Sequence, residues 1–160
     1  MSDYRLRPAH EADRPRLRAL IAERWGAPEM IVHGQVFFPA EQPALLAESG
    51  GELVGLATYR LDGADCELLS LDSLREGIGI GAALLAGVEE QARLSGCTRL
   101  FLVTTNDNLR ALGFYQRRGY RLRALRPGAV DAARALKPQI PEVGENGIPL
   151  RDELELEKWL

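Results

Sequence analysis

Residues that bind metals or form disulfides are scarce in this sequence of 160 residues, which has two cysteines and two histidines. Cys66 and Cys97 are 31 positions apart, so they form neither a disulfide framework nor a CxxC-type metal motif. His10 and His33 have no partner at a metal-ligand spacing. We therefore expect two reduced, mostly buried thiols and no metal ion.

A strong net charge and a long apolar run are also absent. The chain has 20 Lys and Arg against 23 Asp and Glu, a formal net charge of −3, so it lacks the basic field that holds nucleic acid. No run approaches the roughly 20 apolar residues of a membrane-spanning helix, and residues 1–14 are too polar for a signal peptide. The sequence predicts a cytoplasmic protein with no nucleic-acid or membrane partner.

The composition is that of an ordinary folded domain, with 46% hydrophobic and 27% charged residues. No internal repeat, low-complexity tract or long linker divides the chain, so we expect a single domain over residues 1–160. The tail alternates leucine with charged residues, which favours a strand, although Leu, Glu and Lys would also tolerate a helix. The predicted elements are a strand over 4–7, a helix over 15–25, an irregular segment over 27–43, strands over 43–49, 52–61 and 66–71, a helix from the glycines at 77–81 to 95, a strand over 100–105, a helix over 109–118, a strand over 120–125, a short helical piece over 129–137 and a final strand over 150–160.

The order of these elements indicates the fold class. Glycine-containing turns at 50–51 and 62–63 join three strands into an antiparallel meander. The helix after residue 77 then leads to a short β-branched run, which lies parallel to the preceding strand if the crossover is right-handed. We expect an α/β protein of the α+β kind, with a mixed sheet that combines a meander and one βαβ crossover.

A glycine-rich loop, REGIGIGAALL over residues 75–85, lies between a predicted strand and a predicted helix. Free backbone N–H groups and the positive end of the helix dipole meet there, which favours a phosphate-bearing cofactor. A tight turn without a ligand is the alternative. Gly77, Gly79 and Ala82 also satisfy the dinucleotide fingerprint GxGxxA, with Asp107 after the next strand, but only one βαβ unit is present.

Two motifs together resemble the GNAT superfamily of acetyl-coenzyme-A-dependent N-acetyltransferases, in element order over residues 4–125. The family's pyrophosphate loop, Arg/Gln-x-x-Gly-x-Gly/Ala, aligns its glycines with Gly79 and Gly81. Glu76 stands where the family usually has Arg or Gln, directly after Arg75. The second motif, Asn-x-x-Ala-x-x-Phe/Leu-Tyr-x-x-x-Gly-Phe/Tyr, is met by Asn108, Ala111, Phe114, Tyr115, Gly119 and Tyr120.

The resemblance implies a sheet that is splayed open around a coenzyme A cleft. Acetyl-CoA is then the co-substrate, and a main-chain N–H near Leu71 bonds the thioester carbonyl as an oxyanion hole. Asn108 would cap its helix whatever the function. The implied cofactor-binding residues are Leu71, Gly77, Ile78, Gly79, Ile80, Gly81, Ala82, Asn108 and Tyr115.

The resemblance also assigns an acid and suggests a base. Tyr115 corresponds to the tyrosine that protonates the thiolate leaving group; the alternative is a core residue of its helix. Glu67 is the candidate base for the amine, because it is four residues before Leu71 and strand alternation would place both on one face. Asp65 would share that face and Asp72 would lie on the opposite one. A solvated charge near a hairpin is the alternative for both Glu67 and Asp65.

Acceptor residues are less clearly indicated. The family builds its acceptor pocket where this chain has Trp25, His33, Phe37 and Phe38, although isolated aromatics are more often core residues. Acidic residues in the tail could attract a cationic amine, or simply form a solvated strand face. These tail residues are Asp152, Glu153, Glu155 and Glu157.

The sequence thus predicts an N-acetyltransferase that transfers the acetyl group of acetyl-CoA directly to a primary amine of a small molecule or peptide. A noncatalytic acyl-CoA-binding or sensor domain, and a nicotinamide-dinucleotide-binding domain, are the alternatives. A final strand that completes a neighbour's sheet would allow a homodimer without requiring one.

Overall fold

The structure, a computed structural model, describes residues 3–160. The first two residues of the predicted domain lie outside the described residues. The chain divides into two compact units, and each is described by itself. The first unit comprises the residues up to Met30, Phe38–Leu100 and Leu160; the second comprises Ile31–Phe37 and Phe101–Trp159.

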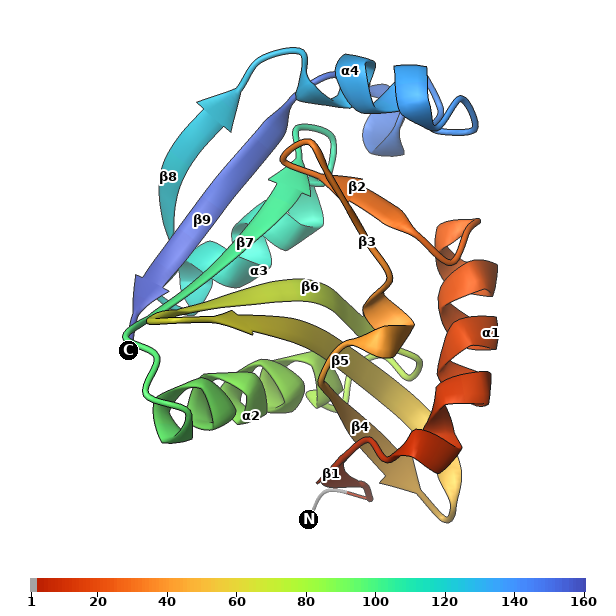
Figure 1. The fold of residues 1–160 in the computed structure, drawn as a ribbon, viewed down its shortest axis with the longest axis vertical. Coiled ribbons are helices and arrows are strands. Elements are labelled where there is room, and N and C mark those ends of the chain that lie inside the picture. The colour runs from red at the N-terminus through yellow and green to blue at the C-terminus, as the bar shows by residue number, and fades with distance from the viewer. Residues whose placement is uncertain (1–2) are drawn as a thin grey trace. The chain divides into compact units, whose positions relative to one another are not determined.

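Every predicted helix and strand is present, and the tail is a strand rather than a helix (Figure 1). The bounds differ from the predicted ones by a few residues, most at the final strand. The elements are β1 (Arg5–Pro8), α1 (Arg14–Trp25), β2 (Met30–Val32), β3 (Gln35–Phe37), β4 (Ala44–Ser49), β5 (Glu52–Asp62), β6 (Asp65–Ser73), α2 (Ile80–Leu94), β7 (Arg99–Thr105), α3 (Leu109–Arg117), β8 (Arg121–Arg126), α4 (Ala129–Leu136) and β9 (Glu153–Trp159), with short 3-10 turns at Glu11–Asp13, Pro39–Glu41 and Glu145–Gly147.

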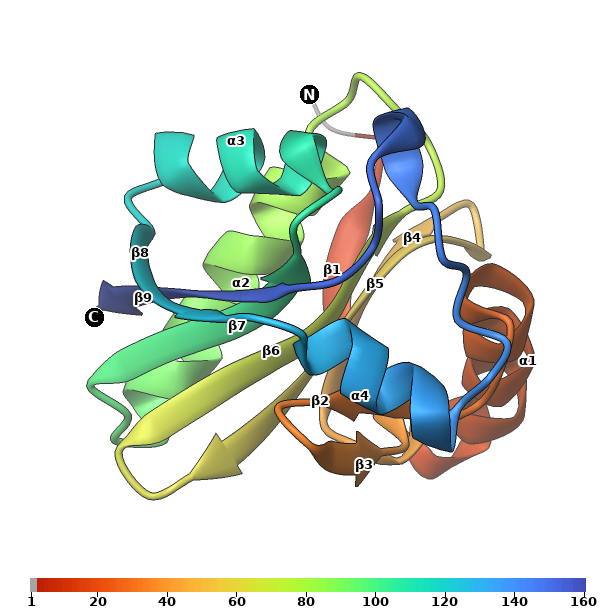
Figure 2. The same cartoon turned by 90° about the horizontal axis from the view of Figure 1, so that it is seen from above.

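An antiparallel sheet in the order β1-β4-β5-β6 forms the centre of the first unit. Helices α1 and α2 cover its two faces (Figure 2). Leu17 of α1 belongs to one buried cluster with Leu46 and Leu56 of the sheet. On the other face Ile80 of α2 lies so close to Gly55 that a Cβ there would overlap its Cγ2 atom. Burial on both faces explains why β4 and β5 are nearly continuous apolar runs.

The start of β7 belongs to the first unit and lies beside the start of β6. The backbone N–H groups of Thr98 and Arg99 donate to the carbonyl of Ala64 at 2.8 and 3.3 Å. The guanidinium of Arg99 donates to Asp65 at 2.9 and 3.0 Å. Because the two strands begin side by side they run in the same direction, as the predicted βαβ crossover requires. The protein is therefore α/β, with a mainly antiparallel sheet and one parallel strand pair, as the sequence predicts.

The segment predicted as irregular, residues 27–43, contains a hairpin of the short strands β2 and β3. Its two turn residues both have a positive φ, +41° at His33 and +76° at Gly34. Two left-handed residues in succession are typical of the two-residue turns that join antiparallel strands. The prediction for this segment also allowed a helical turn, and the structure has a 3-10 turn at Pro39–Glu41. The hairpin was not predicted, because strands of three residues carry no readable alternation.

In the second unit β9 lies between β7 and β8. The register of β8 and β9 pairs Leu122 with Leu156 and Arg126 with Glu153. The final strand is therefore paired on both sides, and β8 is the edge of the three. We expected that a free final strand could complete a neighbour's sheet in a homodimer. Because both edges of β9 are already paired, β9 cannot form a dimer in this way.

Both cysteines are buried free thiols, as predicted. Burial raises the pKa of the Cys66 thiol to about 12, and burial also raises the pKa of Cys97. Because only the thiolate reacts, Cys66 at pH 8 has about one part in ten thousand in the reactive form. We expect the native protein to release almost no thionitrobenzoate from Ellman's reagent at pH 8, and the denatured protein to release two equivalents. Rapid reaction of the native protein would contradict this burial.

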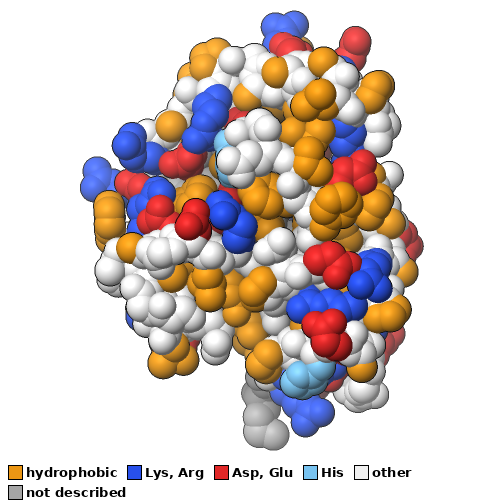
Figure 3. All heavy atoms as spheres, viewed as in Figure 1, with side chains coloured by type: hydrophobic (Ala, Val, Ile, Leu, Met, Phe, Trp, Pro, Cys, Tyr) orange, Lys and Arg blue, Asp and Glu red, His pale blue; other side chains and the backbone are white. Residues whose placement is uncertain are grey.

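The surface carries both signs of charge. On the face shown in Figure 3, Lys and Arg side chains lie among Asp and Glu side chains. Within residues 3–160 no helix combines the length and the hydropathy that a membrane crossing needs. The same residues contain no group of three or more His, Cys, Asp or Glu side chains placed to hold a metal ion.

Candidate functional site

The glycine loop of the first unit connects the end of β6 at Ser73 to the start of α2 at Ile80. Gly77 and Gly79 both have φ +79°, and a Cβ built on either would meet no atom within 4 Å. Gly79 is the N-cap of α2, no side chain caps this end, and the first turn has no acidic residue. The first N–H groups of α2 therefore lack an intrahelical acceptor and a capping side chain at the N-cap, and such a helix start suits a pyrophosphate. The residues present fit the predicted cofactor.

The two charged residues before the glycines are placed differently from each other. Arg75 donates to Glu52 at 2.7 Å and to Ser49 at 3.4 Å, so its guanidinium is held at the β4–β5 turn. Glu76 is exposed. Because solvent screens its charge, an exposed Glu76 carboxylate repels a nearby pyrophosphate less than a buried carboxylate would.

A β-bulge in β6 changes which of the predicted residues share a face. Tyr59 of β5 pairs with Leu68, but the residue before it, Thr58, pairs with Ser70. Leu69 is therefore one extra residue in β6 at this point of the pairing. Paired residues point to the same face, and a single extra residue reverses the alternation beyond it. The expectation that Glu67 and Leu71 share a face is therefore wrong.

Asp72, expected on the opposite face from Glu67, instead shares its face. The hydroxyls of Thr58 and Ser70 on this face are 2.6 Å apart, which confirms the register. Arg24 and Trp25 of α1 donate to the Asp72 carboxylate at 3.1 and 3.4 Å. The face that α1 covers thus carries Glu67 and Asp72, and Leu71 points to the face that α2 covers.

Glu67 is 2% exposed, and Arg60 donates to its carboxylate at 3.3 Å. The alternative of a solvated charge is therefore wrong for Glu67, which is a buried, paired carboxylate. Asp65 has a structural role, because the hydrogen bonds from Arg99 hold the pKa of its carboxyl below the ordinary value.

Helix α3 of the second unit carries both residues of the other motif. The Asn108 side chain accepts a hydrogen bond from the Ala111 N–H at 3.1 Å and so caps the helix, as predicted. Tyr115 is 8% exposed, and its ring packs edge-on against Phe114 and Tyr120, at centroid distances of 5.1 and 5.6 Å. The phenol is thus held in a fixed aromatic cluster.

The four aromatic candidates for the acceptor pocket differ in burial. Phe37 is buried and packs edge-on against His33 in the hairpin, with centroids 5.5 Å apart. Trp25 and Phe38, in the first unit, are 46% and 50% exposed. Only the latter two have the exposure of side chains available to a ligand.

Asp107, the acidic residue of the dinucleotide fingerprint, is 5% exposed and serves the fold. Its carboxylate accepts hydrogen bonds from the Thr105 hydroxyl and the Glu145 N–H. A Cβ on Gly144 would overlap this carboxylate. Asp107 therefore anchors a loop of the second unit rather than facing open space, which disfavours the dinucleotide alternative.

The acidic residues of the tail each have a partner, so the alternative of a solvated strand face is wrong. Asp152 accepts from the Gly128 N–H at the start of α4, and Glu153 accepts from the His33 N–H. Glu155 and Glu157 pair with Arg126 and Arg123. Sequence reasoning did not connect Glu153 with the hairpin, since 120 residues separate it from His33.

Comparison with known proteins agrees with the fold. The uncharacterized protein YdhI of Bacillus subtilis (strain 168) is 49% identical over 148 residues, 92% of each chain. The structure of an IAA acetyltransferase from Bacillus cereus ATCC 14579 superposes with a TM-score of 0.75 at 22% identity, over 98% of this chain and 99% of that one. A GNAT family acetyltransferase from Elizabethkingia anophelis with acetyl-CoA bound gives 0.72 at 20% identity over the whole of both chains. A model of the acetyltransferase (GNAT) family matches residues 6–120, and the chain belongs to this family.

Proposed function

We propose that the chain is a single-domain N-acetyltransferase, over residues 1–160, that transfers the acetyl group of acetyl-CoA to a primary amine. The observation that supports this most is the open N-terminus of α2, which Gly77 and Gly79 leave free of side chains. Consecutive main-chain N–H groups at such a glycine-rich helix start can donate to a pyrophosphate. The acceptor is a small molecule or a peptide amine.

The cofactor contacts follow from the family motifs that the chain carries. The loop and first turn of α2, from Gly77 to Ala82 and including Ile78, Ile80 and Gly81, bind the pyrophosphate. The main-chain N–H near Leu71 donates to the thioester carbonyl oxygen, where negative charge develops. Asn108 holds the start of α3, and Tyr115 extends its phenol toward the sulfur.

Acetyl-CoA supplies an acetyl thioester, at whose carbonyl carbon the amine nitrogen replaces sulfur. Glu67 takes, directly or through water, the proton that the amine must lose, because an ammonium has no lone pair with which to attack. Tyr115 donates its phenolic proton to the departing thiolate, and the C–S bond breaks as the C–N bond is completed. Arg60 keeps the buried Glu67 carboxylate oriented.

The first test is thermal unfolding with acetyl-CoA, coenzyme A, NADH and ATP in separate samples. A ligand at one hundred times its dissociation constant stabilises the folded state by about 2.7 kcal/mol, which raises the midpoint by several degrees at this chain length. We expect acetyl-CoA and coenzyme A to give this shift. A shift with NADH alone would support the dinucleotide alternative, and no shift with acetyl-CoA would contradict the proposal.

Gly79→Ala should separate cofactor binding from fold stability. Gly96, at the other end of α2, is a matched control, because it has φ +83° and an equally open Cβ position. Either substitution places a side chain in the left-handed region, at a cost of roughly 1 to 2 kcal/mol. We expect only Gly79→Ala to weaken acetyl-CoA binding, by about tenfold or more, in a calorimetric titration. Equal weakening by Gly96→Ala would show that the loop is not the binding site.

A noncatalytic acyl-CoA sensor is distinguished by turnover. The assay mixes the protein and acetyl-CoA with each of a panel of primary amines and follows the release of free coenzyme A with Ellman's reagent. The background is low if the protein's own thiols do not react. A protein that binds acetyl-CoA but releases coenzyme A no faster with any amine than without would support the sensor.

A further inference from the structure

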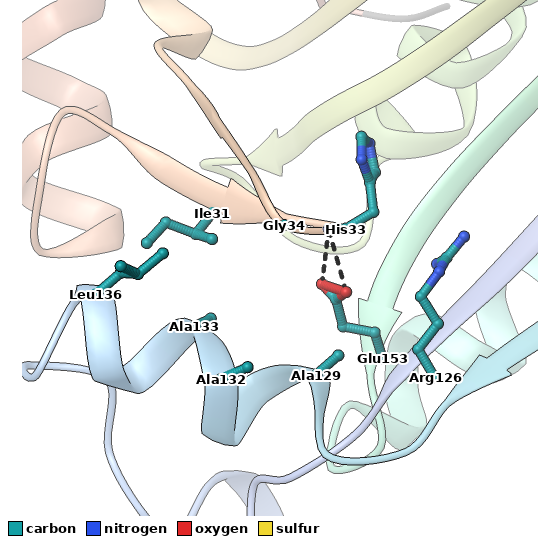
Figure 4. Close-up of a pocket in the computed structure, with 9 residues that line it drawn as sticks. All are labelled: Ile31, His33, Gly34, Arg126, Ala129, Ala132, Ala133, Leu136 and Glu153. Carbon is teal, nitrogen blue, oxygen red and sulfur yellow. Dashed lines mark hydrogen bonds between the residues drawn. The ribbon is translucent and has the colours of Figure 1, made fainter.

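Several buried carboxylates have no part in the proposed mechanism, although burying a carboxylate is costly unless it is paired. Asp107 anchors a loop of the second unit through the Glu145 N–H. Glu153 accepts from the His33 N–H at 3.1 and 3.2 Å, beside a cavity of about 220 Å³ between α4 and the hairpin (Figure 4). Asp72 of the first unit differs from both, because it adjoins Leu71 in β6.

The main chain of β6 is bonded to β5 at Asp72 and directed away from β5 at Leu71. The Leu74 N–H donates to the Val54 carbonyl at 2.9 Å, just beyond the pairing of Ser73 with Gly55. In an antiparallel pair, hydrogen-bonded residues alternate with residues that are not bonded to the partner strand. Asp72 therefore bonds to β5, and the Leu71 N–H points to the opposite side, where a thioester oxygen can accept.

The Asp72 side chain is held by the last two residues of α1. Arg24 Nε donates to its Oδ1 at 3.1 Å, and Trp25 Nε1 donates to its Oδ2 at 3.4 Å. The helix ends directly after them, at Gly26 with φ +77°. Asp72 is 7% exposed. Its carboxylate thus ties the end of α1 to β6 one residue from Leu71.

The fold does not require a carboxylate at this position. Asp72 pairs across the strands with Leu56, which is 0% exposed and belongs to the apolar cluster under α1. An apolar side chain there would extend the cluster, and a buried ion pair is typically no more stabilising than apolar residues of similar volume. Hydrogen bonds depend on direction, whereas apolar contacts do not. The carboxylate therefore contributes a fixed orientation of β6 that an apolar side chain would not supply.

We infer that Asp72 is a positioning residue. It holds β6 between β5 and the end of α1, so that the Leu71 N–H stays directed at the acetyl carbonyl oxygen and acetyl-CoA is favoured over coenzyme A. The inference rests on the proposed function, because it requires the acetyl group to lie at Leu71. Coenzyme A has no acetyl carbonyl, so a misdirected N–H weakens the binding of acetyl-CoA alone. Loss of a merely structural residue would change both affinities by the same factor.

The test is the ratio of the dissociation constants of coenzyme A and acetyl-CoA, each measured by calorimetric titration of the whole protein. We expect Asp72→Ala to lower this ratio about three- to tenfold, the range for loss of one hydrogen bond. Asp65→Ala is the matched control, because Asp65 lies at the other end of β6 and also accepts from an arginine, Arg99. It should leave the ratio unchanged. An unchanged ratio in Asp72→Ala, or an equal fall in both variants, would overturn the inference.

A second variant decides the question if Asp72→Ala does not fold. Arg24→Met removes one donor to Asp72 from a side chain that is 42% exposed, and should lower the ratio about threefold. An unchanged ratio in Arg24→Met would then overturn the inference. If the unmodified protein binds neither compound, the proposed function fails and the inference fails with it. If it binds both and no substitution changes the ratio, the inference alone fails.

Discussion

Replacing Tyr115 by phenylalanine is expected to lower kcat by about a hundredfold, with acetyl-CoA affinity unchanged within a factor of two to three. General acid catalysis typically contributes about 10²- to 10⁴-fold, and we take the low end because water can also protonate a thiolate. Phenylalanine keeps the edge-on ring packing that the structure gives Tyr115 with Phe114 and Tyr120. The measurement is steady-state release of coenzyme A, with a separate calorimetric titration of acetyl-CoA.

Tyr120→Phe is the matched control, because it removes a phenol oxygen from the same aromatic cluster. Tyr120 is 2% exposed and packs against Tyr115 itself. If Tyr115 were only a core residue, both variants would lose some stability and neither would lose turnover. A kcat for Tyr115→Phe within threefold of the unmodified protein would therefore remove Tyr115 from the mechanism.

Replacing Arg7 by methionine is expected to have the largest effect on stability. The Arg7 guanidinium donates to both Asp13 and Glu48, with Nη2 at 2.8 Å from an oxygen of each, and so joins β1, the 3-10 turn before α1, and β4. The two carboxylate side chains are each 10% exposed and that of Arg7 is 24% exposed. We expect the free energy of unfolding at pH 7 to fall by about 2 to 3 kcal/mol, less than the roughly 3 to 5 for a fully buried pair.

The same cluster sets a pH dependence. Hydrogen bonds from Arg7 and then from Arg16 lower the pKa of Glu48 from 4.5 to about 2, and a hydrogen bond from Arg7 lowers the pKa of Asp13 further below its ordinary value. A carboxyl whose folded pKa is depressed stabilises the protein fully above its unfolded pKa. This stabilisation is lost as the pH falls from about 4.5 to about 2.

Urea unfolding at pH 7 and at pH 3 measures both effects. The unmodified protein should lose more stability between these two pH values than Arg7→Met does. Arg18→Met is the control, because Arg18 and Glu41 form an ion pair whose side chains are 52% and 47% exposed. It should leave the unfolding midpoint almost unchanged, and an equal loss with Arg18→Met would mean that burial does not set the strength of these pairs.

Local features of the fold could be predicted from the sequence. The Asn108 cap, the glycine loop before α2 and the final strand are signalled by residues within a few positions of one another, and the structure has all three. The two spaced motifs were enough to indicate the family. Backbone preferences and the periods of helices and strands act over this short range, so a single sequence displays them.

The face assignment in β6 could not be predicted in this way. Alternation placed Glu67 with Leu71, and the extra residue Leu69 in the pairing with β5 reversed it. A bulge is a property of two strands rather than one, so no pattern within β6 announces it. The β2–β3 hairpin was missed for a related reason, since its short strands depend on each other and on a turn with His33 in a left-handed conformation.

The sequence by itself determined the order of helices and strands, the open glycine loop and the membership in an acetyltransferase family, because each depends on short-range pattern. Only the tertiary structure decided that Glu67 is buried against Arg60, that Arg7 joins two carboxylates from distant segments, and that Glu153 meets the hairpin beside an apolar cavity. These contacts connect residues up to 120 positions apart. Their geometry comes from the packing of whole elements, which fixes distances that chain spacing leaves open.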